Sequence, residues 1–342
     1  MVLTSLTNFA HSEQTNGRYV LTPFVWVFAL MFSLGQWATL DSTPSFGMVA
    51  IAPDKAPDDL VTVDPADEVA PLDVTSDTVD IVPVRPAPSP QPRPIRRGSF
   101  FADLRKPLDF NQWRVSTHKN DKQSDYYGGP WQIENIVQEP DRLILKVIAG
   151  KDGQRPSMAE MQTRQKYHYG RYEVIMRPSA ESGVVSTFFT YTGPWAGDPK
   201  DEIDIEFVGK RPETVEYNYW KNARKGAYSR EPLDFDISSG LNLYAFEWHP
   251  DEIIWFVNGE EHYRSPRDAS RIPSHAGNIF ISAWTGVEGM YAWTGPARFE
   301  ESAQAEYACV SFTPFDGDSY SCSDLWAQDP QFQSDNLNIS SD

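Results

Sequence analysis

Positively charged residues are scarce in this 342-residue chain, which has 30 Lys and Arg against 48 Asp and Glu and a formal net charge of −18. Nucleic acids and anionic membrane surfaces attract basic proteins, so this charge argues against both as partners. Cysteine is scarcer still, because only Cys309 and Cys322 occur. The sequence also lacks internal repeats and an EF-hand calcium pattern, and residues 99–315 lack long helical periodicity.

The N-terminal 40 residues combine a polar leader with an apolar run. Residues 1–18 are polar and contain one arginine, and residues 19–40 then run for 22 residues without a charge. That length spans a bilayer. The long leader and the absence of a small-x-small cleavage site favour an uncleaved signal anchor over a cleaved signal peptide, although both interpretations fit. Either one predicts an exported protein at the cell envelope, anchored and facing the periplasm or exterior, or secreted.

Residues 41–98 have a different composition, with 11 prolines between Pro44 and Pro94 and ten acidic residues between Asp41 and Asp80. Such a segment cannot bury enough apolar surface to fold alone. We expect a disordered linker that ends in an extended, proline-rich spacer and holds the following domain away from a membrane.

Residues 99–315 contain many short apolar or alternating runs separated by Gly, Pro, Asp and Asn, which predicts one all-β domain, a sandwich or barrel. Asn258-Gly259 lies between two such runs and indicates a tight hairpin. The tail, residues 316–342, has six Asp and no Lys or Arg, and we expect disorder apart from what Cys322 anchors. In an exported chain Cys309 and Cys322 can form a disulfide, or both can remain thiols with Cys309 buried.

The segment "DEIDIEF", residues 201–207, places Glu202, Asp204 and Glu206 at alternate positions between large apolar residues. A period of two is that of a strand, so the three acids share one face while the opposite face packs on a core. Asp and Glu are poor strand formers, and like charges side by side repel. This local conflict is typical of a functional site.

The spacing of the acids favours glycoside hydrolysis. Glu202 and Glu206 have Cα atoms about 13 Å apart in a strand, and side chains that lean together approach the ~5–5.5 Å separation of a retaining carboxylate pair. Asp204 between them helps to keep one Glu protonated. A solvated acidic face and a calcium site are the alternative interpretations, although one flat strand offers calcium few ligands.

Longer motifs extend this interpretation: "AEMQTRQKYHYGRYEVIMRP", "DEIDIEFVGK", "VEYNYWKN", "LYAFEWHPDEIIWFVNGEE" and "IFISAWTG". Together they resemble family 16 of the glycoside hydrolases, in particular the branch of bacterial lichenases and succinoglycan-type exopolysaccharide endoglycanases. The resemblance implies a concanavalin-like β-jelly roll with a sugar-binding cleft and a retaining mechanism. It implies Glu202 as nucleophile, Glu206 as general acid/base and Asp204 as assisting carboxylate. The E-x-D-x-E spacing argues against the laminarinase, agarase and carrageenase branches, which usually carry one extra residue.

The resemblance also implies a set of substrate-binding residues that contact the sugar chain through polar groups or aromatic faces: Glu160, Gln162, Phe189, Tyr191, Asn218, Trp220 and Trp284. We add Lys200, which precedes the acidic strand where the family usually has an aromatic residue, and Trp195, which lies just upstream and can supply that ring instead. Three positions depart from the family pattern. Lichenases commonly have Arg at the position of Gln162 and an aromatic residue at that of Lys200, and the family's structural calcium usually uses an Asp at the position of Ala308. We therefore expect weak calcium binding or none, and no other cofactor.

The sequence thus predicts an endo-β-glycanase that cleaves internal bonds of a β-1,3-1,4-glucan or a succinoglycan-like exopolysaccharide with retention. A cationic Lys200 beside the cleft suits an anionic polysaccharide. Two alternatives remain open at this point: a transglycosylase acting on the same polymers, and a non-catalytic carbohydrate-binding jelly roll.

Overall fold

The computed structural model describes residues 95, 97–118, 126–152, 154–329 and 332. The expected leader, the apolar run 19–40 and nearly all of the linker 41–98 lie outside these residues. Within the described part, no helix is both long and apolar enough to cross a bilayer. The chain divides into units Met1–Pro83 and Val84–Asp342, and every described residue belongs to the second unit.

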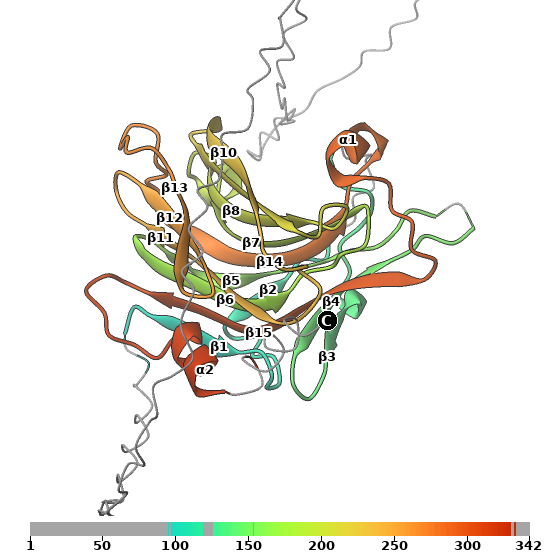
Figure 1. The fold of residues 1–342 in the computed structure, drawn as a ribbon, viewed down its shortest axis with the longest axis horizontal. Coiled ribbons are helices and arrows are strands. Elements are labelled where there is room, and N and C mark those ends of the chain that lie inside the picture. The colour runs from blue at the N-terminus through green and yellow to red at the C-terminus, as the bar shows by residue number, and fades with distance from the viewer. Residues whose placement is uncertain (1–94, 96, 119–125, 153, 330–331, 333–342) are drawn as a thin grey trace, which may run out of the picture. The chain divides into compact units, whose positions relative to one another are not determined.

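Two antiparallel sheets make up the domain, and Figure 1 shows them as curved layers, with β7, β8 and β14 in one and β1 and β15 in the other. The predicted all-β jelly-roll sandwich is confirmed. The first sheet, which we call the cleft sheet, has the order β10-β9-β8-β7-β14-β5-β2. Its strands are β2 (Trp113–Val115), β5 (Ala159–Tyr167), β7 (Val184–Thr192), β8 (Asp201–Val208), β9 (Thr214–Lys221), β10 (Arg224–Pro232) and β14 (Gly277–Thr285).

The second sheet, the back sheet, has the order β13-β12-β11-β6-β15-β4-β3, with β1 paired to β15. Its strands are β1 (Phe100–Asp103), β3 (Ile136–Gln138), β4 (Leu143–Ile148), β6 (Gly170–Arg177), β11 (Asn242–Trp248), β12 (Ile253–Val257), β13 (Glu260–Arg264) and β15 (Ser302–Thr313). Short helical turns complete the domain: η1 (Ile133–Asn135), η2 (Pro194–Ala196), η3 (Glu288–Met290), α1 (Tyr291–Thr294) and α2 (Cys322–Gln328).

The predicted hairpin at Asn258-Gly259 is present between β12 and β13, and both residues have positive φ, 50° and 91°. These angles suit a two-residue turn that follows the twist of the strands. The core between the sheets is rich in aromatic rings, and some of them reach across it to hold the cleft sheet. Trp255 Nε1 donates to the backbone oxygen of Asp204 at 3.2 Å, and Tyr307 OH lies 3.0 Å from the backbone oxygens of both Thr187 and Ser282.

The C-terminal tail is more ordered than expected. A disulfide joins Cys309 to Cys322, which confirms the paired interpretation of the two cysteines. Helix α2 begins at Cys322 behind a capping box made by Ser321 and Asp324. Leu325 and the two cysteines pack in a second apolar cluster on the back sheet. The disulfide at Cys322 therefore holds α2 against the back sheet, where the helix buries apolar side chains. The sequence pattern did not assign those side chains to a core.

Candidate active site

The acid-rich strand β8 is the third of seven strands in the cleft sheet. Its apolar residues Ile203, Ile205 and Phe207 are fully buried on the core side. Glu202, Asp204 and Glu206 alternate with them and lie on the opposite face, where Asp204 is 5% exposed and the two Glu are half-buried. The predicted separation of an acidic face and a core face is confirmed.

The fourth acid of the motif, Asp201, does not share that face. It is 2% exposed and accepts hydrogen bonds from the backbone N–H groups of Asn222 and Ser274, both at 2.8 Å. His275 Nδ1 lies 2.8 Å from the same carboxylate. Asp201 therefore fixes two loops at the end of β8, a structural role that distinguishes it from the three acids of the cleft.

Strand register brings the predicted site residues together in three rows that cross the sheet. Residues directly opposite one another in neighbouring strands have Cβ atoms about 4.5–5.5 Å apart, so each row is a line of contacting side chains. The row of Glu206 contains Glu160, Ser282, Thr187 and Glu216; that of Asp204 contains Gln162, Phe280, Phe189 and Asn218; and that of Glu202 contains Asn278, Tyr191 and Trp220.

Lys200 lies directly at the first carboxylate. Its Nζ is 2.7 Å from Glu202 Oε2, and it also lies 4.4 Å from the centre of the Trp220 ring and 6.0 Å from that of Tyr191. Burial acts to lower the pKa of Lys200, but the neighbouring Glu202 outweighs burial and raises it. The cation is thus held over an aromatic ring and against a carboxylate, beside the position expected for the nucleophile.

The surroundings of Asp204 and Glu206 instead favour the protonated form of each carboxyl group. Burial, followed by the charges of Glu202 and Glu206, raises the pKa of Asp204 well above its usual range. Burial, followed by the charges of Glu216 and Glu202, raises the pKa of Glu206 to about 8. Asp204 Oδ2 and Asn218 Oδ1 are buried and have no hydrogen-bond partner among the residues that the structure describes. The site therefore holds a protonated Glu206 beside an ion-paired Glu202.

The remaining predicted residues line the same face or lie near it. Glu160 receives a hydrogen bond of 2.6 Å from Ser116, and burial raises its pKa to about 7. Phe189 stacks on Phe280 with ring centres 4.8 Å apart. Trp195 is 51% exposed on η2, in the connection between β7 and β8.

Sequence reasoning missed three residues of the site: Tyr127, Glu216 and Trp293. The Tyr127 ring lies 5.2 Å from Trp284, and the charges of Glu160, Glu202 and Glu206 all act on its hydroxyl, whose pKa is raised mainly by burial. The centre of the Trp293 ring lies 5.8 Å from that of Trp284. Glu216 continues the alternation of Asn218 and Trp220 by one step, so that pattern carried a signal for it, whereas Tyr127 and Trp293 have none.

A calcium site does not fit at position 308. The Ala308 side chain has no oxygen, its backbone oxygen accepts a hydrogen bond from Leu104 N–H, and the residue is fully buried in the apolar cluster with Cys309 and Cys322. Among the residues that the structure describes, no group of three or more His, Cys, Asp or Glu is arranged to hold a metal ion.

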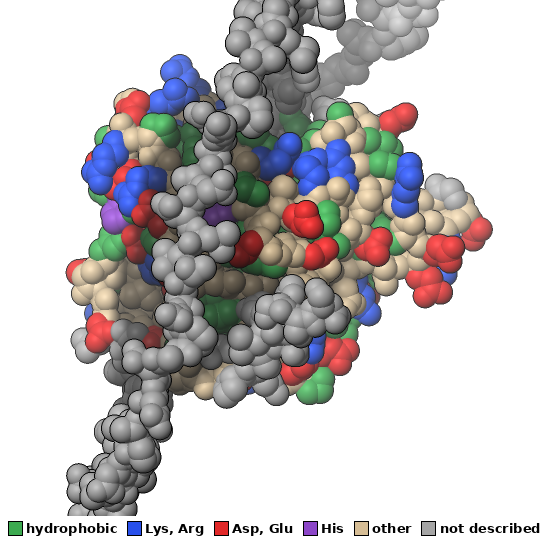
Figure 2. Space-filling view, in the orientation of Figure 1, with side chains coloured by type: hydrophobic (Ala, Val, Ile, Leu, Met, Phe, Trp, Pro, Cys, Tyr) green, Lys and Arg blue, Asp and Glu red, His purple; other side chains and the backbone are tan. Residues whose placement is uncertain are grey.

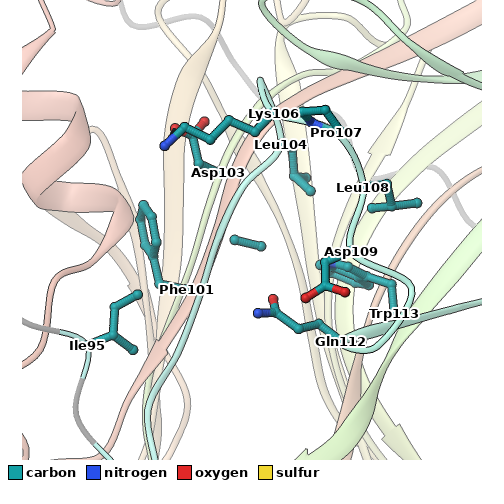
Figure 3. A pocket seen from close by; sticks show the side chains of 11 residues that line it. Ile95, Phe101, Asp103, Leu104, Lys106, Pro107, Leu108, Asp109, Gln112 and Trp113 are labelled. Carbon is teal, nitrogen blue, oxygen red and sulfur yellow. Dashed lines mark ion pairs between the residues drawn. The ribbon is translucent and has the colours of Figure 1, made fainter.

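The surface has two further features. A hollow of about 270 Å³ lies along β1 and the turn after it, lined by residues such as Phe101, Lys106 and Trp113 (Figure 3), and none of its lining residues belongs to the three rows. Figure 2 shows several patches of Lys and Arg in the upper half of the face it presents, although the whole chain is acidic.

Comparisons with known proteins agree with this geometry. The profile of the family described as "Glycosyl hydrolases family 16" matches residues 120–306. A β-glucanase of Brevibacillus brevis is 38% identical over 193 residues, which cover 55% of this chain and 72% of that protein. A β-glucanase of Acetivibrio thermocellus is 35% identical over 208 residues, and this chain spans only 60% of its length.

Solved structures show the same similarity. A β-1,3-1,4-glucanase (lichenase) derived from a mouse hindgut metagenome superposes with a TM-score of 0.59 at 34% identity, covering 64% of this chain and 99% of the other. A β-glucanase of Bacillus licheniformis gives a TM-score of 0.59 at 30% identity, covering 63% of this chain and 98% of the other. With a family profile that spans more than half of its length and an acid-rich strand at the centre of the matching fold, the chain belongs to family 16 of the glycoside hydrolases.

Proposed function

We propose that this chain is a retaining endo-β-glucanase, with Glu202 as nucleophile, Glu206 as general acid/base and Asp204 as assisting carboxylate. One observation carries the proposal. Three carboxylates occupy one face of a central strand, and one of them lies against a cation while another is surrounded by groups that favour its protonated form. Glu202 pairs with Lys200, while burial and neighbouring charges keep Glu206 protonated. Two carboxylates in such different environments are suited to the two roles of a glycosidase.

In the first step, Glu206 donates its proton to the glycosidic oxygen while a Glu202 oxygen attacks the anomeric carbon, and the bond to the leaving sugar breaks. In the second step, Glu206 accepts a proton from water. The resulting hydroxide attacks the same carbon and releases Glu202. Two inversions give net retention. The surroundings of Asp204 favour its neutral form, which avoids a third negative charge on this face of β8.

The substrate that we propose is a polymer of β-linked glucose, either a β-1,3-1,4-glucan or a succinoglycan-like exopolysaccharide. Trp220 and Tyr191 are partly exposed aromatic rings on the cleft face and suit stacking on sugar rings, and the half-buried Asn218 adds a polar side chain there. Trp284 is only 7% exposed and packs against Tyr127 and Trp293. Similarity to a lichenase supports the first polymer.

Two lysines beside Trp220 favour a polymer with acidic substituents. Lys200 lies over the Trp220 ring, and Lys225 is the register partner of Trp220 on β10. Lys225 is exposed, and its Nζ lies 4.7 Å from the centre of the Tyr228 ring. Ammonium groups next to a stacking ring suit a sugar that carries a carboxylate. The uncharged run 19–40 and the proline-rich linker support our further proposal that the enzyme works at the cell envelope.

The test measures release of reducing ends by the purified full-length chain from mixed-linkage β-glucan, laminarin, carboxymethyl-cellulose and a succinylated acidic exopolysaccharide. We expect cleavage of the mixed-linkage glucan or of the acidic polymer. Glu202→Gln should remove it, with an unchanged near-UV circular dichroism spectrum. Residual turnover close to wild type in this variant, or binding without cleavage on all four polymers, would overturn the proposal. Products longer than an oligosaccharide substrate would show transfer in place of hydrolysis.

A further inference from the structure

A second buried glutamate lies directly beside Glu206. Glu216 on β9 is its register partner in the cleft sheet and has no exposed surface. The two residues occupy the same row, and side chains directly opposite each other on one face are close neighbours. Like charges in this arrangement are destabilising, so the pair requires an explanation.

Four donors surround Glu216 and occupy both of its oxygens. Arg211 Nη2 and Arg230 Nε donate to Oε1 at 2.6 and 2.9 Å, and Trp293 Nε1 and Tyr228 OH donate to Oε2 at 2.7 and 2.8 Å. Burial acts to raise the pKa of Glu216, but these hydrogen bonds outweigh burial and lower it. Glu216 is therefore an ionised carboxylate whose charge is fixed in place.

We propose that Glu216 is a positioning residue that fixes a negative charge beside Glu206 and thereby keeps this acid/base group protonated when the substrate arrives. The inference rests on the proposed role of Glu206. A general acid must hold its proton at the working pH, and a neighbouring like charge favours the protonated form. Because Glu216 is satisfied by its own donors, it does not compete with Glu206 for that proton.

Other charged groups around Glu206 act on it in both directions. Glu202 on β8 also raises the pKa of Glu206, less strongly than Glu216 does, while the cations Lys225 and Lys200 lower it. Asp204, next along β8, is itself driven toward its neutral form. The charged or titratable groups around Glu206 are thus Glu202, Asp204, Glu216, Lys200, Lys225, the hydroxyl of Tyr127, Glu160 in the same row, and Arg211 and Arg230, which pair with Glu216.

A purely structural role is the competing explanation, because the Glu216 cluster also joins β9, β10, the turn before β9 and helix α1 through Trp293. In a plot of kcat/KM against pH, the fall at high pH (the alkaline limb) reports the pKa of the general acid in the free enzyme. Loss of a structural junction lowers stability but does not move this limb, so the position of the limb separates the two explanations.

The experiment compares pH profiles of kcat/KM for the full-length wild type and Glu216→Gln on a cleaved β-glucan. We expect the alkaline limb to move down by about one pH unit or more, because a unit charge a few ångströms away is removed and the two arginines lose their counter-charge. Glu216→Asp keeps the charge and should keep the limb close to wild type. Glu306→Gln is the matched control, since Glu306 is a buried carboxylate with two arginine partners in the back sheet.

Arg230→Met provides a second variant if Glu216→Gln fails to fold, because the Arg230 side chain is 42% exposed and its loss is mild. With one cation removed, the negative charge beside Glu206 is less compensated, and we expect the limb to move up by a few tenths of a pH unit. An unmoved limb in both folded variants, with lower stability alone, would overturn the inference. Failure of the proposed function is separate, because Glu202→Gln or Glu206→Gln would then retain activity.

Discussion

Both sheets of the sandwich bury carboxylates, and they differ in what surrounds each one. In the back sheet, Glu306 is paired with Arg142 and Arg177, and Glu173 accepts hydrogen bonds from Arg171 at 2.8 Å and from Ser311 at 3.1 Å. In the cleft sheet, Asp204 Oδ2 has no hydrogen-bond partner within the described part of the chain. Burial by itself acts to raise the pKa of all such groups.

The outcome depends on the partners. Arg177 and Arg142 outweigh burial at Glu306 and lower its pKa, whereas the neighbours of Glu206 are other carboxylates that add to burial and raise its pKa. Buried polar groups in proteins are normally satisfied. The raised pKa values of Asp204 and Glu206, together with the unsatisfied Asp204 Oδ2, therefore distinguish the site from buried carboxylates that are paired with arginine.

The strongest test of this difference between the sheets is Glu206→Gln, which removes the proposed proton donor of the cleft. On the natural polymer we expect kcat/KM to fall by about a factor of 10³ or more, because general acid catalysis of a poor leaving group is lost. On an aryl β-glucoside with an activated leaving group, the first step needs little protonation, so the loss should be much smaller. Equal losses on both substrates would contradict the assignment of Glu206 as the acid. Initial rates on the two substrates decide this.

In the back sheet, Glu306→Gln should act on stability and leave activity per folded molecule unchanged. Removing one partner of a buried pair costs roughly 3–5 kcal/mol, but Arg142 and Arg177 are 28% and 34% exposed and remain partly hydrated. We therefore expect a loss of about 2 kcal/mol, or roughly 5 °C in Tm. Thermal unfolding followed by circular dichroism measures it, and a comparable loss of kcat in the folded variant would contradict the separation of the two sheets.

The sequence alone predicted the acidic face, its core face and the hairpin at Asn258-Gly259, because each depends on the period of a strand or on the conformations of two adjacent residues. It also placed Cys309 and Cys322 as a candidate disulfide. The partners of each site residue depend instead on which strands pair and in what register. Glu216 opposes Glu206 only because β8 and β9 align at that position.

Contacts between distant segments were equally hidden. Tyr127 reaches the site because its segment bridges to Gly286 beside the end of β14, and no local pattern marks that bridge. Lys200 was expected near the sugar. Its contact with Glu202 depends on the conformation of the Lys200 side chain, which lies over the Trp220 ring. Helix α2 is stabilised by the disulfide and by apolar contacts with the back sheet, and a seven-residue helix has little stability of its own.

The smallest expected effect is a gain of stability in the cleft sheet. The folded pKa of Glu206, about 8, lies above the usual value of about 4.3 for an unfolded chain. Its contribution to folding is therefore complete below about pH 4 and is lost as the pH rises toward 8. Gln cannot ionise, so Glu206→Gln should become more stable relative to wild type as the pH rises between these two values. Glu306→Gln provides the opposite sign, because a depressed pKa contributes stability at high pH and loses it as the pH falls. Unfolding free energies of the wild type and both variants, measured at about pH 4 and about pH 8, give the two pH dependences. Parallel pH dependences would show that the two sheets do not treat their carboxylates differently.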